Sequence, residues 1–253
     1  MSAELLEKRC YELLEMADLN GFEDPYNELW DMFDGREGSE GSEGSAGSEG
    51  REAERMELSG RIAGVAYALG EYYHDRFRFH DLCGVYNDIY ALTKTIPESE
   101  AAALSCVMLA VGVFELKFQM SDFENIESYI NELLPVTARF PENEEFAVYG
   151  AISLCNLLQL CPYDISVFTG RMLSILDRIE ELAGRFPGSA DMQVCCLRSF
   201  AFFLSYGKPR LRDEIFEEYY HRAARAFADN EGIVAGDDLA DIRYELYKQG
   251  IKL

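Results

Sequence analysis

Arginine, histidine and aromatic side chains gather in one stretch of the chain, EYYHDRFRFH at residues 71–80. Arginine guanidinium groups pair with carboxylates and stack on aromatic rings. Tyr72, Tyr73, Arg76 and Arg78 are therefore candidates for holding an anionic side chain or a C-terminal carboxylate of a partner. The alternative is a loop between two helices, where the rings fill the end of the hairpin and the arginines pair with neighbouring carboxylates.

No motif of a common catalytic or metal site accompanies this stretch. The sequence contains no G-x-S-x-G, H-E-x-x-H, P-loop or G-x-G-x-x-G pattern, and it has only three histidines. His74 and His80 are six residues apart, which does not place them on one face of a helix as metal ligands. The seven cysteines show no C-x-x-C pair and no zinc spacing. We therefore expect no enzyme activity, no cofactor and no metal. The enzymatic alternative is an all-α fold with a carboxylate-lined pocket.

The chain is strongly acidic, with 46 Asp and Glu against 23 Lys and Arg in 253 residues and a net charge of −23. This charge opposes binding to nucleic-acid phosphates or to anionic lipid, so we expect neither a nucleic-acid nor a membrane partner. It suits a basic protein or peptide, with solubility alone as the alternative explanation. The cysteines within apolar runs behave as small hydrophobic residues. Reduced cysteines and an N-terminus without the apolar core of a secretory signal predict a cytoplasmic protein.

A short pattern recurs along the chain at nearly constant spacing. Its copies are IPESE at 96–100, FPENE at 140–144, FPGSA at 186–190 and a weaker FADNE at 227–231. The prolines are 44 and 46 residues apart, and the fourth copy follows 41 residues later. A fixed period of about 20–50 residues is typical of stacked repeats.

Each copy of the pattern is predicted to separate two helices. Before it, apolar residues follow one another at alternating steps of four and three, which gives an amphipathic helix that the proline ends. Ser99, Asn143 and Ser189 lie where the next helix needs an N-cap. Pro135 is a departure that should kink the helix before the second copy.

The helices predicted after the junctions are apolar on all sides. They cover Ala101–Phe114, Phe146–Leu160 and Val194–Leu204. A helix that is apolar all round is buried, and these runs are shorter than the roughly 20 residues needed to span a bilayer. The repeating unit is therefore a two-helix hairpin, with a buried helix A followed by an amphipathic helix B. The chain should end in a polar capping helix at Gly236–Gln249.

This organisation resembles the tetratricopeptide-type repeats, which end helix B with a proline and open the next helix A after a short polar turn. The resemblance covers roughly residues 54–250. It implies a right-handed α-solenoid, a superhelix of stacked hairpins that binds peptides or proteins. The period of about 44 exceeds the family's usual 34, and the Trp/Leu/Gly/Tyr signature of helix A is absent.

Some members of that family bind a peptide carboxylate through Lys, Asn and Arg on successive A helices. Here the A helices offer Lys117, Asn156 and Arg198, and no such clamp can be carried over. Arg198 is a lone cation in an apolar helix, so it either extends to the surface or meets a carboxylate. It is retained as a candidate binding residue.

The N-terminal part is predicted as a helical segment at 1–34 and a flexible Gly/Ser/Glu linker at 35–51, followed by the repeat domain at 52–253. Asn20-Gly21 should end the first helix, and Asp24-Pro25 should start a second. Trp30 and Phe33 belong either to a tethered ligand that folds back onto the repeats or to the first hairpin, which caps them.

The sequence thus favours a non-catalytic protein-interaction scaffold that binds a protein or peptide partner. The alternative from another class is a self-assembling structural subunit, whose apolar helices complete their burial in a homodimer.

Overall fold

The computed structural model describes residues 2–37, 48–163, 170–208 and 210–252 of the chain. Over these ranges the fold is all-α, with eleven α-helices and one short 3-10 helix, and no strand is formed. The all-α prediction is confirmed. The helices belong to two compact units, Met1–Leu116 and Lys117–Leu253, which are described separately below.

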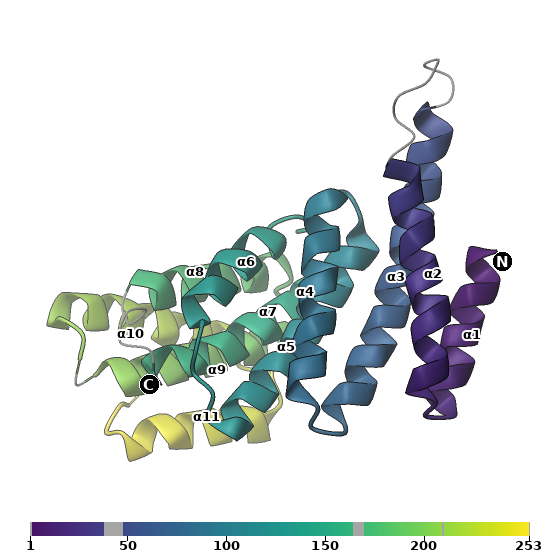
Figure 1. Cartoon of the computed structure of the whole chain (residues 1–253). Coiled ribbons are helices and arrows are strands. Elements are labelled where there is room, and N and C mark those ends of the chain that lie inside the picture. Colours follow the sequence, from purple (N-terminus) through teal and green to yellow (C-terminus); the bar gives the residue numbers. More distant parts are fainter. Residues whose placement is uncertain (1, 38–47, 164–169, 209, 253) are drawn as a thin grey trace. The chain divides into compact units, whose positions relative to one another are not determined.

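The first unit contains α1 (Ala3–Glu15), α2 (Leu19–Glu37), α3 (Ser48–His74), α4 (Phe79–Thr95) and most of α5 (Glu100–Met120). The helices α1, α2 and α3 each pack against the other two, and α3 also packs against α4 (Figure 1). The Ser59 hydroxyl of α3 lies 2.8 Å from that of Ser99, just before α5. Close approach of α3 and α5 depends on Gly70, because a β-carbon there would overlap the Leu109 side chain.

The turn between α1 and α2 lies earlier than predicted. The helix α1 ends at Glu15, and Ala17 takes a left-handed conformation with φ 56°. Asp18 then caps α2, because its Oδ1 accepts a hydrogen bond from the Gly21 N–H at 3.0 Å. The predictions of a break at Asn20-Gly21 and a start at Asp24-Pro25 were wrong, since this cap begins the helix before either pair and Pro25 lies inside it.

Both ends of the predicted 35–51 linker are helical. The helix α2 continues to Glu37 and α3 begins at Ser48, while residues 38–47 lie outside the described residues. A helix that is already packed extends at little cost through Glu, Ser and Arg. The linker predicted from composition was therefore longer at both ends than the segment between α2 and α3.

The second unit contains α6 (Ile126–Val136), α7 (Glu144–Leu160), the 3-10 helix η2 (Cys161–Tyr163), α8 (Gly170–Arg185), α9 (Ala190–Gly207), α10 (Asp213–Asp229) and α11 (Gly236–Lys248). The helix α9 is central, since it packs against α7, α8, α10 and α11. The helix α7 also packs against α6 and α8. Its apolar side chains and those of α9 are largely buried, as their composition predicted. Residues 164–169, before α8, and Pro209, before α10, lie outside the described residues.

The repeated junctions adopt one turn at the first three copies. In each, the N–H of the residue two beyond the proline donates to the carbonyl of the residue before it: Ser99 to Ile96 (3.1 Å), Asn143 to Phe140 (3.2 Å) and Ser189 to Phe186 (3.0 Å). Two of the three predicted caps form. The Ser99 hydroxyl accepts from the Ala102 N–H at 3.3 Å and Asn143 Oδ1 accepts from the Phe146 N–H at 2.9 Å, whereas Ser189 makes no side-chain cap.

Pro135 ends its helix rather than kinking it. The helix α6 stops at Val136, so this helix B is shorter than the one predicted to run up to Pro141. Pro135 has no N–H to donate to the carbonyl of Asn131, which weakens the last turn of α6, and the helix ends one residue later.

Two helices are long and apolar enough, by length and composition, to cross a membrane: Glu100–Met120, with 21 residues, and Glu144–Tyr163, with 20. The prediction that these runs were too short was therefore wrong in length, because each helix extends beyond its apolar stretch. Most of each helix is buried inside the protein, which is equally the property of a core helix.

Candidate functional site

The predicted basic and aromatic residues meet at the loop between α3 and α4. The guanidinium of Arg76 lies 3.7 Å from the centre of the Tyr72 ring, and that of Arg78 lies 4.7 Å from the Tyr73 ring. The two tyrosine rings contact edge to face at 5.9 Å. Arg78 Nε also donates to Asp81 at 2.8 Å, and Arg76 donates to the Tyr72 carbonyl at 3.2 Å.

These contacts engage both arginines within their own loop. A partner carboxylate would have to compete with Asp81 for Arg78, at a site where both side chains are exposed. The geometry therefore favours the packing alternative for Tyr72, Tyr73, Arg76 and Arg78 over a ready anion site.

Trp30 and Phe33 lie on α2 in a row of aromatic rings. Trp30 contacts Phe33 edge to face at 6.0 Å and Tyr26 at 6.4 Å. Phe33 is buried, with the Arg55 guanidinium of α3 at 5.1 Å from its ring. This packing against α3 in the first unit favours the hairpin interpretation over the tethered ligand.

Two of the three clamp residues considered from the sequence, Arg198 and Lys117, are engaged with separate carboxylates. Arg198 of α9 is exposed and pairs with Asp238 of α11 at 3.2 Å. It therefore both reaches the surface and meets a carboxylate. Lys117 is buried, and its Nζ donates to Asp122 at 2.7 Å and to the Glu124 carbonyl at 3.0 Å.

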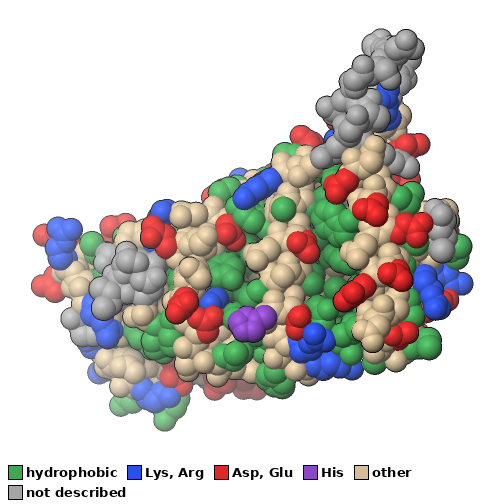
Figure 2. All heavy atoms as spheres, viewed as in Figure 1, with side chains coloured by type: hydrophobic (Ala, Val, Ile, Leu, Met, Phe, Trp, Pro, Cys, Tyr) green, Lys and Arg blue, Asp and Glu red, His purple; other side chains and the backbone are tan. Residues whose placement is uncertain are grey.

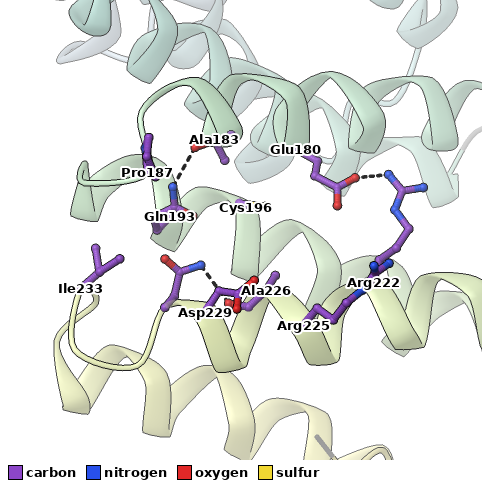
Figure 3. A pocket seen from close by; sticks show the side chains of 12 residues that line it. Glu180, Ala183, Pro187, Gln193, Cys196, Arg222, Arg225, Ala226, Asp229 and Ile233 are labelled. Atoms are coloured by element: carbon purple, nitrogen blue, oxygen red, sulfur yellow. Dashed lines mark hydrogen bonds and ion pairs between the residues drawn. The ribbon is translucent and has the colours of Figure 1, made fainter.

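A pocket in the second unit is the strongest candidate site (Figure 3). It has a volume of about 370 Å³, within the range of small-ligand sites. It lies where the C-terminal ends of α8 and α10 meet the first turns of α9. Its wall includes apolar groups and six polar side chains: Glu180, Gln193, Arg222, Arg225, Asp229 and Asn230.

Two buried amides are fixed in this wall. Gln193 is 6% exposed, and its Nε2 donates to the carbonyls of Ala183 at 2.9 Å and Phe186 at 3.2 Å (Figure 3). Asn230 is 5% exposed and donates through Nδ2 to the Ala226 carbonyl at 2.8 Å. Both amide groups thus satisfy carbonyls at helix C-termini, and their side-chain oxygens remain as acceptors.

The charges around the pocket are unequally paired. Arg222 contacts three carboxylates, with Asp177 at 2.7 Å, Glu218 at 3.7 Å and Glu180 also in contact. Its guanidinium also lies 4.2 Å from the Tyr219 ring. Burial lowers the pKa of Arg222, but hydrogen bonds to Glu180 and Asp177 outweigh this and leave it raised, so the group stays charged.

Arg225 and Asp229 are exposed at the rim. Neither makes an ion pair with any residue that the structure describes. They are therefore the two rim charges that are open to a ligand.

The pocket offers no activated nucleophile. Cys196 lines it, but burial raises the pKa of this thiol to about 12, so it stays protonated at neutral pH. Burial likewise raises the pKa of Tyr219 to about 12, and its hydroxyl donates to Asp177 at 3.0 Å. No group of three or more His, Cys, Asp or Glu within the described ranges is arranged to hold a metal.

Gln193, Asn230, Arg225 and Asp229 were not predicted as site residues from the sequence. A signal was nevertheless available, because the residue six positions after each junction proline is alanine in the first two copies and Gln193 in the third. A long amide at a position where the first two copies carry alanine distinguishes the third copy from them.

Comparison with known proteins returns no relative: no family model, no curated protein and no solved structure matches this chain.

Proposed function

We propose that this protein is a non-catalytic interaction scaffold that binds a basic peptide or protein in the cytoplasm. Its hairpins would stack as tetratricopeptide-like repeats in a right-handed α-solenoid. The observation that carries the proposal is the recurrence of one hydrogen-bonded junction turn at Ser99, Asn143 and Ser189. In the second unit, α7, α9 and α11 follow as neighbouring first helices of successive hairpins, which is how such repeats pack.

Charge supports a basic partner. The net charge is −23, and Figure 2 shows Asp and Glu side chains spread over the face in view, between apolar side chains. A distributed negative potential accelerates the approach of a cationic partner and is weakened by salt.

The N-terminal segment 1–34 would act as the cap of the repeats. An array needs a terminal element that covers its last apolar face, and Trp30 and Phe33 lie in the hairpin that packs on α3. The helix α11, polar on its outer side, would close the other end.

Selection from a random peptide-display library on the immobilised full chain tests this function. We expect enrichment of peptides with net positive charge that bind reversibly and compete with one another for the chain. An equally acidic, monomeric control protein must not enrich the same peptides. Failure to enrich any peptide beyond that control would contradict the proposal.

The homodimer alternative required apolar helices whose surface is not buried within a single chain. In the second unit, α9 is covered by four helices of the same chain, so it needs no second copy. We therefore expect a monomer in solution, which light scattering at increasing concentration will check.

A further inference from the structure

We propose that the pocket between α8, α9 and α10 holds an arginine side chain of the partner. This inference deepens the proposed function, on which it rests for the nature of the partner, by naming the group that is recognised and the residues that recognise it.

At the pocket, the third copy of the repeat differs from the first two. Ala103, Ala147 and Gln193 occupy equivalent positions. Their backbone N–H groups donate to the carbonyls of Ser99, Asn143 and Ser189 at 3.1, 3.0 and 3.0 Å. The two alanines are fully buried against neighbouring side chains. Glutamine at the third position places a polar side chain where the first two copies carry a methyl group.

The amides of Gln193 and Asn230 leave their oxygens available as acceptors at the pocket. The NH2 group of Gln193 is held by two carbonyls and that of Asn230 by one, which fixes the orientation of both amides. Over the described ranges, no donor reaches Gln193 Oε1 or Asn230 Oδ1, and both residues line the pocket. Neither oxygen is a fully buried atom without a partner, so both are reachable from the pocket and can accept hydrogen bonds from an occupant that carries N–H groups.

The surrounding charge selects a cationic occupant. Among the lining residues, the carboxylates of Glu180 and Asp229 balance the guanidinium groups of Arg222 and Arg225. Two further carboxylates, Asp177 and Glu218, contact Arg222 from outside the lining and make the surroundings of the pocket net negative. Arg222 contacts Asp177, Glu180 and Glu218. Asp229, in contrast, has no cationic partner among the residues that the structure places. In addition, α8 and α10 end at the pocket, and the C-terminus of a helix carries partial negative charge. The first turn of α9 and the rim cation Arg225 oppose this.

A guanidinium matches this arrangement better than an ammonium does. It presents five N–H donors in a planar fork, so it can meet Asp229 and the two amide oxygens together. Its three-carbon stem can pack along apolar wall atoms of Pro187, Cys196 and Ile233, the last of which is 38% exposed at the rim.

The test uses the full chain and a minimal probe, N-acetyl-arginine methylamide, titrated while amide NMR signals are recorded. We expect saturable shifts at the side-chain NH2 groups of Gln193 and Asn230, with affinity of millimolar order for a single side chain. N-acetyl-citrulline methylamide, which keeps the shape without the charge, should bind at least several-fold more weakly. Shifts confined to other parts of the chain, or equal affinity for citrulline, would overturn the inference.

Variants of two exposed rim residues give opposite predictions. Asp229→Asn should weaken the probe by about 3- to 10-fold, in line with the loss of a partly exposed ion pair. Arg225→Gln should strengthen it by about 2-fold or more, because a like charge is removed. Glu217→Gln, an equal charge change on α10 outside the pocket, is the control and should alter binding little. If Arg225→Gln weakens the probe, or if N-acetyl-glutamate methylamide binds instead, the pocket is an anion site and the inference is wrong.

The two proposals can fail separately. Display-selected peptides that bind equally well to wild type, Asp229→Asn and Arg225→Gln would leave the scaffold function standing and refute the arginine pocket. Binding of the probe in the pocket with no peptide selected would support the pocket chemistry and contradict the scaffold function.

Discussion

The Gln193 side chain donates to the Ala183 carbonyl at 2.9 Å and thereby joins the first turn of α9 to the last turn of α8. This hydrogen bond satisfies a carbonyl that has no partner within its own helix. It also sets the direction of the amide, so that Oε1 is left for a ligand. One residue therefore closes a junction of the repeat and shapes the candidate site.

The junction caps should contribute unequally to stability. Asn143→Ala removes the hydrogen bond from the Phe146 N–H and should lower the free energy of unfolding by about 1 kcal/mol. Ser189→Ala is the matched control. Because Ser189 makes no side-chain cap, this substitution should lower the free energy of unfolding by only a few tenths of the loss expected for Asn143→Ala. Urea unfolding of both variants checks this, and equal losses would contradict the account of the turn.

Gly70 should be intolerant of a methyl group. A β-carbon there would overlap Leu109 across the α3–α5 contact, so Gly70→Ala should destabilise the chain by about 1–3 kcal/mol. Gly84, inside α4, has open space around the same position. Gly84→Ala should therefore stabilise by about 0.5–1 kcal/mol through helix propensity. Thermal unfolding distinguishes the two, and a neutral Gly70→Ala would show that the helices do not approach so closely.

The stability of the fold should depend on Asp122, which pairs with the buried ammonium group of Lys117. Asp122→Ala leaves the charge with fewer partners and should cost about 3 kcal/mol of unfolding free energy, the lower end for a buried pair because Asp122 is partly exposed. Lys117→Met removes the charge while keeping most of the volume, and should cost less than Asp122→Ala. The reverse order in chemical denaturation would contradict this description of the pair.

Stability should fall at alkaline pH. Burial raises the pKa values of Cys195 and Cys196 to about 12, from about 9, so the folded chain keeps protons that the unfolded chain loses. Their contribution is fully present below about pH 9 and is lost as the pH rises toward 12. Each thiol adds a downward slope of up to about 1.4 kcal/mol per pH unit in this window.

The double variant Cys195→Ala/Cys196→Ala provides the comparison for that slope. It should be less stable than wild type at neutral pH, yet lose less stability between about pH 9 and 11. Parallel losses in the two proteins, measured by urea unfolding, would show that these thiols do not remain protonated in the fold.

The parts of the fold that follow from local chemistry could be predicted. Spacing and residue type led to the turn and cap at Asn143 and to the terminal helix α11, because proline, cap residues and apolar periodicity act over a few residues. The left-handed conformation of Ala17 and the cap by Asp18 could not be predicted. Asp18 and Asp24 are both possible N-caps, and the packing of α1 against α2 favours the earlier one.

The candidate site was largely beyond prediction. The pocket depends on where the Gln193 and Asn230 amides point, and this is set by carbonyls on other turns and helices. The cluster at Tyr72 and Arg76 was predictable as a cluster, but its internal pairing was not, because composition does not tell whether an arginine meets its own loop or a partner.

The most direct test of the scaffold is the affinity of the most enriched display peptide for the full chain, compared with a scrambled peptide of identical composition. Binding measured by calorimetry at low and high salt should be at least tenfold tighter for the selected order than for the scramble, and it should weaken as salt screens the charges. Equal affinity for the two peptides would mean that the acidic surface merely attracts positive charge, and it would contradict recognition by a repeat scaffold.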